Sequence, residues 1–345
     1  MSANAILSEP LVESILRQLP RLTLGVVGDL FLDRYLEIDA TLTETSLETG
    51  LDAYQVVRVR SQPGAAGTVI NNLAALGIGC IRPLSVVGED GEGFELLQAL
   101  RRMPALDLGS VVLRADRRTP TYTKPMLHEP GAIPRELNRL DIHNRTPLSD
   151  DLEAQLLERL TALWEQVDGM IVLDQVSWPD CGVVTRRLRD HLAHLAGRDP
   201  KLPVLADSRA QIGLFREVAL KPNAREALAA TGSEALESAL EHLAHQANRP
   251  VFCTRSEDGI RLVEPGTLHP REIPGYPVVG PIDPVGAGDS TSAGILSALA
   301  AGATLDQAAA LGNLVASITV QQLGTTGTAT PTQVRARLSE VLGKN

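Results

Sequence analysis

The run Asp-Pro-Val-Gly-Ala-Gly-Asp that ends at Asp289 has the residue types and the spacing that phosphoryl transfer requires. Gly286, Ala287 and Gly288 are small enough for their backbone N–H groups to turn toward one point. The residues that follow have a helical pattern, and it stops at Gly302, a residue type that often ends helices. The N–H groups therefore lie at a helix N-terminus, where free donors and the helix dipole together bind anions. Such donors can stabilise the charge of a phosphoryl group in transit.

Asp289 begins the same predicted helix, where its carboxylate can accept the proton of an incoming hydroxyl. The alternative is purely structural, because a glycine turn capped by an aspartate occurs in α/β proteins without any chemistry. A bare GxGD would favour that alternative, whereas the full run with small residues one turn later favours catalysis. The sequence has no GxxxxGK[ST] run, which excludes a P-loop kinase at the level of motifs.

The elements that must position this turn can be predicted from the apolar pattern. Short segments rich in β-branched residues predict strands, and longer amphipathic segments between them predict helices. The strands are expected at 22–28, 170–173, 204–206 and 251–254, and the helices at 152–167, 182–195 and 233–247. This alternation indicates an α/β fold with a mostly parallel sheet that is covered on both faces. In such folds ligands bind at the carboxyl ends of the strands.

Three further segments alternate apolar and polar residues, which is typical of strands with one solvated face. They lie at 35–42, 54–60 and 119–127. We expect them to form a small β lid, with lid segments near 35–62 and 117–128. A lid would shield a phosphoryl acceptor from water, which otherwise competes for the phosphoryl group.

Composition limits the class of protein. The chain has 345 residues, of which 43% are apolar and 21% charged, and we expect residues 1–345 to form one globular domain. A formal net charge of −10 disfavours nucleic acid and anionic membranes as partners. The three cysteines are widely separated and show no metal-binding spacing, and no apolar run reaches 18 residues. A reduced, cytoplasmic protein is the expectation.

Residues 283–296 resemble, position for position, the C-terminal signature of the PfkB/ribokinase family of carbohydrate kinases. The resemblance implies a ribokinase-like three-layer αβα fold with a mostly parallel central sheet and a small β-strand lid. It also implies transfer of the γ-phosphoryl of ATP, with Mg²⁺, to a hydroxyl of a sugar or sugar phosphate. In that family the residue at Asp289 is the general base, and the amides at Gly286, Ala287 and Gly288 form the anion hole.

Asn223 and Glu226 resemble the family's Asn-x-x-Glu motif, which follows a strand and whose Glu organises Mg²⁺. Water is expected to mediate this contact, because Mg²⁺ dehydrates reluctantly. The plain alternative is an ordinary helix start, with Asn as N-cap and Glu at N3. The position of the pair before Asp289 favours the family motif.

Thr254, which ends the next predicted strand, and Ser256 and Gly259, which follow it, resemble the family's nucleotide-binding turn, although a simple hairpin turn explains them equally well. Asn313 lies on a later predicted helix, where family members often contact the adenine. A helix-surface asparagine is the alternative.

At the other end of the chain, Asp29 and Asp33 follow the first predicted strand. Asp33 matches the family aspartate that binds sugar hydroxyls, and a carboxylate can accept from two neighbouring hydroxyls. Asp29 is counted among the candidate substrate-binding residues.

The run that contains Gly64, Ala65, Thr68 and Asn72 resembles the first family signature. Its small residues would let the backbone approach the substrate closely. The family usually has a Gly pair where this chain has Gly64-Ala65, and Asn where it has Thr68. These differences concern the identity of the substrate rather than the phosphoryl chemistry.

Within the family, four segments resemble the heptose-phosphate kinase half of bifunctional ADP-heptose synthesis enzymes: 28–35, 121–124, 138–141 and 323–325. The nucleotidyltransferase half is expected to be absent, because the sequence has no HxGH-type motif. A phosphorylated acceptor would account for basic residues near the lid, among them Lys124, Arg118, Arg58 and Arg60. The alternative is that they are solvated charges, and it is favoured for Arg58 and Arg60.

Two other functions stay open. A nucleoside kinase on the same fold is one, and a family member that binds sugar or nucleotide without turnover is the other. The intact turn at Asp289 argues against the second. A homodimer through the lid is also expected, since an open sheet edge can pair with another chain.

Overall fold

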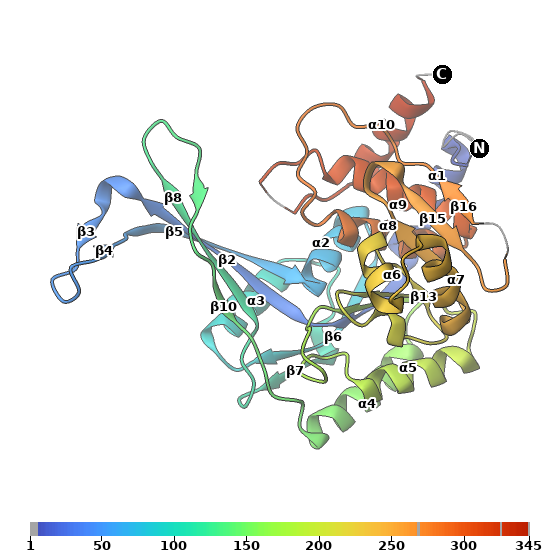
Figure 1. The fold of residues 1–345 in the computed structure, drawn as a ribbon, viewed down its shortest axis with the longest axis horizontal. Coiled ribbons are helices and arrows are strands. Elements are labelled where there is room, and N and C mark those ends of the chain that lie inside the picture. Colours follow the sequence, from blue (N-terminus) through green and yellow to red (C-terminus); the bar gives the residue numbers. More distant parts are fainter. Residues whose placement is uncertain (1–5, 268–269, 325, 344–345) are drawn as a thin grey trace.

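In the computed structural model, which describes residues 6–267, 270–324 and 326–343, one large sheet runs through the body of the molecule (Figure 1). Thr325 of the segment 323–325 lies outside these residues. The strand order is β16 (Arg271–Ile273), β15 (Ile260–Val263), β14 (Val251–Thr254), β13 (Ala219–Leu220), β12 (Val204–Ser208), β11 (Gly169–Asp174), β1 (Thr23–Gly28), β6 (Cys80–Gly88) and β7 (Val111–Arg114). Neighbours from β14 to β7 are parallel, and β15 and β16 are antiparallel additions at one edge. The predicted parallel sheet is thus confirmed.

Two hydrophobic clusters, one on each face of this sheet, make the body a three-layer structure. One cluster includes side chains from α1 (Glu9–Gln18), α2 (Ala66–Leu76), α3 (Gly91–Leu100), α8 (Ala287–Ala300), α9 (Leu305–Thr319) and α10 (Pro331–Leu342). The other includes side chains from α4 (Asp150–Trp164), α5 (Arg186–Arg198), α6 (Ala224–Thr231) and α7 (Leu236–Ala247). Among the described residues, no helix has both the length and the apolar character needed to cross a membrane.

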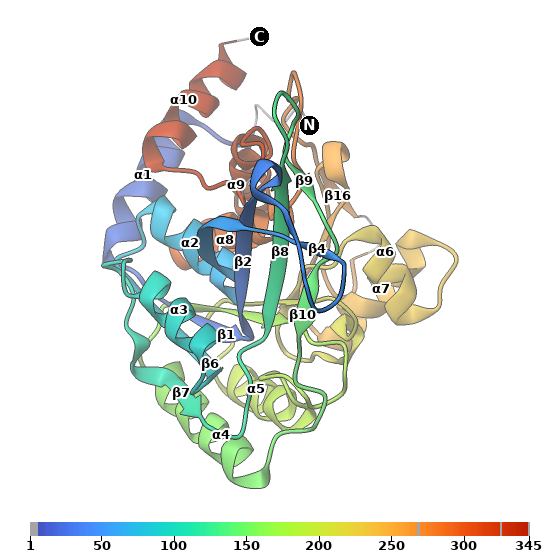
Figure 2. The same ribbon diagram turned by 90° about the vertical axis from the view of Figure 1, so that its left-hand side faces the viewer.

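A second sheet forms an arm that projects from the body (Figures 1 and 2). Its order is β10 (Leu140–Ile142), β8 (Thr121–His128), β2 (Leu30–Asp39) and β5 (Val56–Ala65), and β9 (Arg135–Glu136) pairs with β8. A two-stranded hairpin of β3 (Glu44–Thr45) and β4 (Asp52–Ala53) lies at the outer end. The predicted lid strands are therefore present, and we call this sheet the lid.

The starts of three predicted elements were wrong by three residues or more. The first lid strand begins at Leu30 rather than at residue 35, so that only Asp29 separates it from β1. The helix expected at 182–195 begins at Arg186, where the Thr185 hydroxyl caps it by accepting from Leu188 N (3.1 Å). The helix expected from residue 233 begins at Leu236.

Candidate active site

The glycine turn lies at the N-terminus of α8, as the sequence predicts. Gly286 is the N-cap residue and has a φ of 79°, a left-handed conformation that favours glycine. Asp283 fixes the turn, because its carboxylate accepts from Val285 N at 3.1 Å and from Gly324 N at 3.0 Å. A Cβ at Gly286 would lie 3.5 Å from Cγ2 of Thr68, so the turn and the start of α2 approach each other closely. This brings two predicted site residues together.

Asp289 lies in the first turn of α8 and is partly buried. Burial raises the pKa of its carboxyl, the negative charge of Asp207 adds to this effect, and the resulting pKa is about 7. The positive charges of Lys221 and Arg209 oppose this rise. A carboxyl that titrates near neutral pH is suited to accept a proton at working pH.

Lys221 and Asp207 form a buried ion pair beside this carboxyl. Lys221 Nζ lies 2.9 Å from Asp207 Oδ2, and a Cβ at Gly288 would lie 3.6 Å from Nζ. The Ser292 hydroxyl of α8 also donates to Asp207, at 3.3 Å. Sequence reasoning assigned no role to either member of the pair. Asp207 belongs to β12, and the rule that ligands bind at the carboxyl ends of strands could have found it.

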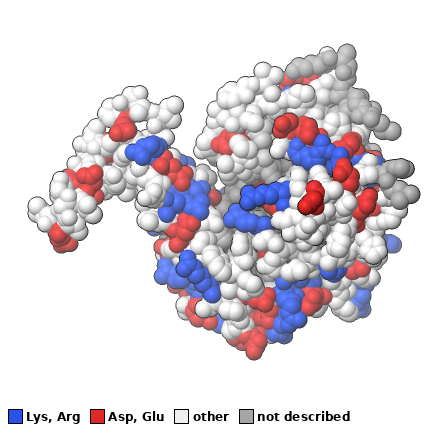
Figure 3. Space-filling model, viewed as in Figure 1, with Lys and Arg blue, Asp and Glu red and all other residues white. Residues whose placement is uncertain are grey.

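Arg209 directly follows β12 and was also missed. Its guanidinium is exposed and forms no ion pair with the described residues, while its charge acts on both Asp289 and Glu226. Figure 3 shows Lys and Arg side chains gathered at a hollow of the body that faces the lid. In a protein of net charge −10, such local donors are what would attract a polyphosphate.

Asn223 and Glu226 form the capping box that the structural alternative predicted. Asn223 N donates to Glu226 Oε2 at 2.8 Å, and Glu226 N donates to Asn223 Oδ1 at 2.9 Å. Burial raises the pKa of Glu226, and the nearby charge of Asp207 adds to this effect. The same charges thus act on Glu226 and on Asp289, which places both carboxylates around the Lys221–Asp207 pair.

The predicted nucleotide residues share one region at the edge of the main sheet. Thr254 N donates to Pro222 O at 2.9 Å, next to Asn223. Gly259 ends the short turn that contains Ser256 and lies directly against the backbone of Ile273. Asn313, buried on α9, donates to Ile273 O at 3.0 Å and to Pro274 O at 3.1 Å. Asn313 therefore holds the segment that covers the turn, and an adenine contact for it stays a prediction.

Asp33 faces the partners that a sugar-binding carboxylate would need. Lys124 Nζ lies 3.2 Å from Asp33 Oδ1 and donates to the Tyr35 hydroxyl, also at 3.2 Å. A Cβ at Gly64 would lie only 2.6 Å from Asp33 Oδ2, so a larger residue there would displace this carboxylate. Ala65, the N-cap residue of α2, has a φ of 52°, an uncommon value for a residue other than glycine.

Two of the predicted substrate-binding residues, Asp29 and Asn72, form hydrogen bonds within the protein. Asp29 is buried, its Oδ1 accepts from Val183 N at 2.8 Å, and burial raises the pKa of its carboxyl to about 7. Asn72 is fully buried in α2, where its amide donates to Thr68 O at 2.9 Å. This geometry favours a role in holding the loop around Val183 and the start of α2, rather than direct contact with a substrate.

Comparison with known proteins agrees with these observations. The pfkB family carbohydrate kinase pattern matches residues 31–333. The bifunctional protein HldE of Trichlorobacter lovleyi is 33% identical over 343 residues, which cover 95% of this chain and 65% of that protein. HldE of Pelobacter propionicus is 33% identical over 341 residues, which cover 94% and 64%. The chain thus spans a little less than two thirds of the length of these relatives.

Solved structures show the same fold at low identity. A ribokinase from Arabidopsis thaliana, complexed with ribose and ATP, has a TM-score of 0.67 at 18% identity and covers 92% of this chain and 98% of its own. Phosphofructokinase-2 from Escherichia coli, in complex with potassium, has a TM-score of 0.66 at 18% identity, with 92% and 99% covered. The expected ribokinase-like fold is confirmed. Together with the family match over most of its length, this shows that the chain belongs to the pfkB family of carbohydrate kinases.

Proposed function

We propose that this protein transfers the γ-phosphoryl group of ATP to a hydroxyl of a sugar or sugar phosphate, with Asp289 as the general base. The observation that carries the proposal is the position of Asp289. Its carboxyl, with a pKa of about 7, lies in the first helical turn after the small-residue turn and beside the Lys221–Asp207 pair. A base and a cluster of anion donors at one helix N-terminus meet the two needs of phosphoryl transfer.

In the proposed reaction, Asp33 orients the acceptor against the Gly64 turn and the Asp289 carboxylate accepts the proton of the attacking hydroxyl. The amides of Gly286, Ala287 and Gly288 then donate to the oxygens of the transferred phosphoryl group. The hydroxyl oxygen forms a bond to the γ-phosphorus while the bond from this phosphorus to the β,γ-bridging oxygen breaks, and ADP leaves. Positioning and charge stabilisation supply most of the barrier reduction in such transfers.

We further propose that Lys221 and Arg209 contact the phosphate chain. Lys221 is 3% exposed and already neutralised in part by Asp207, so it can act as a fixed charge at the base of the site. Arg209 is exposed and has a planar guanidinium suited to bidentate contact with phosphate oxygens.

Glu226 fits a role in holding Mg²⁺. Within the described ranges, no group of three or more His, Cys, Asp or Glu side chains could hold a metal by itself. Mg²⁺ characteristically keeps several waters and is bound through one or two carboxylates together with substrate phosphates, which suits a single carboxylate here. When bound, the ion would neutralise charge on the phosphate chain. Glu226, held by Asn223 N, would be its contact with the protein.

The lid side chains favour an acceptor with an anionic group, of which a heptose phosphate is the example that the resemblance suggests. Lys124 lies beside Asp33, and the Arg60 guanidinium lies over the Tyr35 ring at 4.4 Å. Arg60 also pairs with Glu37 at 2.6 Å, so the carboxylate offsets the positive charge of the guanidinium. Arg58 is exposed and has no ion pair among the described residues.

A homodimer through the lid is proposed as well. Strand β5 lies at one edge of the lid sheet, and its Val57 and Val59 are 58% and 48% exposed. Leu47 at the outer hairpin is fully exposed. Light scattering after size exclusion would give twice the monomer mass of 36.9 kDa, and a monomer would contradict the proposal.

The test of the reaction is a coupled ADP-release screen with Mg·ATP against sugars, sugar phosphates and nucleosides. A hit that disappears in Asp289→Asn would support a kinase and identify its acceptor class. A hit confined to nucleosides would favour a nucleoside kinase instead. ATP binding without turnover on any acceptor would favour a family member that binds without catalysis.

A further inference from the structure

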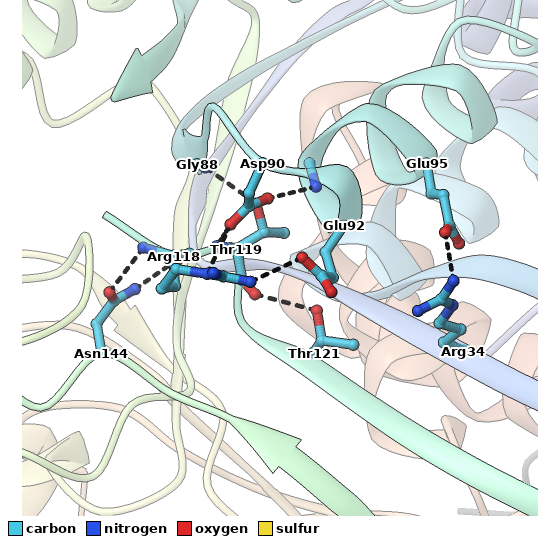
Figure 4. Close-up of polar contacts among 10 residues, drawn as sticks. Arg34, Gly88, Asp90, Glu92, Glu95, Arg118, Thr119, Thr121 and Asn144 are labelled. Atoms are coloured by element: carbon cyan, nitrogen blue, oxygen red, sulfur yellow. Dashed lines mark hydrogen bonds and ion pairs between the residues drawn. The ribbon is translucent and has the colours of Figure 1, made fainter. Parts of the chain in front are cut away.

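Glu95 of α3 contacts two strands of the lid at once. Its Oε1 lies 2.8 Å from Nη2 of Arg34 on β2, and its Oε2 accepts from the Ser61 hydroxyl of β5 at 2.6 Å. Arg34 and Ser61 are direct partners across the β2–β5 ladder. One carboxylate therefore bridges the same register position on both strands, and Figure 4 shows its ion pair with Arg34.

This bridge lies immediately behind the predicted acceptor site. Asp33 precedes Arg34 on β2 and lies opposite Gln62 in the β2–β5 ladder. Gly64, two residues after Gln62 on β5, borders the Asp33 carboxylate. Successive side chains of a strand point to opposite faces. Arg34 points to α3, so Asp33 points away from it, toward Lys124.

The N-terminus of α3 holds the third lid strand. Asp90, its N-cap residue, accepts from Gly93 N at 2.7 Å and also from Thr119, whose backbone N and hydroxyl lie at 2.9 and 2.8 Å. Arg118 Nε lies 3.1 Å from the same carboxylate, and its Nη2 donates to Glu92 at 2.9 Å (Figure 4). These residues directly precede β8, so α3 is tied to the chain where it enters the lid.

The rest of α3 belongs to the body. Leu96, Leu97 and Leu100 are buried in the hydrophobic cluster on its face of the main sheet. One helix thus connects the core to three strands of the lid, through Asp90 at its start and Glu95 in its middle. Glu95 is the weaker of the two connections, because its side chain and that of Arg34 are 27% and 30% exposed.

We infer that Glu95 is a positioning residue that fixes β2 and β5 against the body and so sets the distance between Asp33 and Asp289. The inference rests on the proposed function, since it assigns to Asp33 a role in binding the acceptor. Without the bridge the lid strands keep their ladder but gain freedom relative to α3. The acceptor then binds more weakly and water reaches the phosphoryl group more often, while the nucleotide region at Gly259 and Asn313 is unaffected.

The test compares wild type with Glu95→Ala and with the charge swap Glu95→Arg/Arg34→Glu. We expect Glu95→Ala to raise the acceptor KM about tenfold, equivalent to about 1.4 kcal/mol, with the KM for ATP unchanged. More ADP should form per phosphorylated acceptor, because water reaches the phosphoryl group. The charge swap should restore part of the coupling. Glu13→Gln, which removes a carboxylate paired with Arg335 between α1 and α10, should change none of these quantities.

Hydrogen exchange of the backbone amides gives a second readout that needs no activity. In Glu95→Ala, amides of β2 and β5 near the bridge should exchange faster than in wild type and in Glu13→Gln. Unchanged exchange, or equal increases in both KM values, would overturn the inference. If wild type shows no kinase activity while exchange in the lid responds to Glu95→Ala, the proposed function fails and the bridge itself stands, without the acceptor role.

Discussion

Replacing Asp289 with Asn should stabilise the fold while it strongly lowers turnover. In the folded protein, burial raises the pKa of this carboxyl from its ordinary value of 3.8 to about 7. Between these values the folded state binds more protons than the unfolded state, so the free energy of unfolding falls as the pH rises. The contribution of the Asp289 carboxyl to the free energy of unfolding is complete below pH 3.8, where the group is protonated, and is lost above about pH 7. Asparagine has nearly the same shape and does not ionise, so the variant avoids the loss.

The size of the effect follows from the same values. The interval from 3.8 to about 7 gives an upper limit of about 4 kcal/mol, at 1.36 kcal/mol per pH unit. Asp289 is only partly buried, so solvent screening reduces this to about 1 to 2 kcal/mol. For 345 residues, 1 kcal/mol corresponds to about 1.4 °C. The variant should therefore melt about 1.5 to 3 °C above wild type at pH 8, with a smaller gain at pH 5.

Thermal unfolding followed by fluorescence at pH 5, 6 and 8 measures this gain, and the coupled assay measures turnover. We expect kcat to fall roughly 10²-fold or more, the usual size of a general-base contribution. Asp283→Asn is the matched control, because this aspartate of the same loop accepts two backbone hydrogen bonds and its loss should lower the melting temperature. A lower melting temperature for Asp289→Asn at pH 8, or a gain that does not vary with pH, would refute the reasoning. Near wild-type turnover would refute the role as base.

Three more outcomes are expected. The kcat of wild type should rise with pH through about 7 as Asp289 ionises. Asp207→Asn should move this rise to lower pH, because the Asp207 charge raises the Asp289 pKa. A pH–rate profile that is the same in the variant as in wild type would contradict this. Lys221→Met should lower the free energy of unfolding in urea by about 3 to 5 kcal/mol, since it leaves Asp207 buried without its partner, and Lys221→Met/Asp207→Asn should recover part of that loss. Gly64→Ala should raise the acceptor KM and leave the KM for ATP unchanged, because the added methyl group displaces the Asp33 carboxylate; equal effects on both constants would argue against Asp33 as an acceptor ligand.

Features set by neighbouring residues could be predicted from the sequence. The turn before Asp289 and the capping box of Asn223 and Glu226 each depend on fewer than ten consecutive residues, and the structure contains both. The alternation of strands and helices was equally accessible, because burial on both faces leaves continuous apolar runs. The family resemblance then supplied the fold and a list of site residues, and the fold and family are confirmed.

Features that join distant segments could not be predicted. The Lys221–Asp207 pair forms because β13, which precedes Lys221, lies beside β12, which contains Asp207. The two residues taken by themselves in the sequence do not indicate that these strands are neighbours. The start of β2 was missed because Leu30, Phe31 and Leu32 are all buried, and the alternating sequence pattern appears only from residue 35 onward. Val183 was assigned to a helix, yet Asp29, 154 residues away, holds it in a loop.

The order of the lid strands has a consequence for how the chain is made. Strand β2 pairs in parallel with β8, with Leu32 opposite Thr121, so the middle of the lid sheet joins segments almost 90 residues apart. At a synthesis rate of about 5 to 20 residues per second, β2 waits roughly 5 to 20 s for this partner to leave the ribosome. During that interval only the β5 side of its ladder can form, and one edge of β2 stays open. The lid is thus completed late, and the nascent hairpin of β2 and β5, with its exposed valines, is the segment most in need of protection from aggregation at that stage.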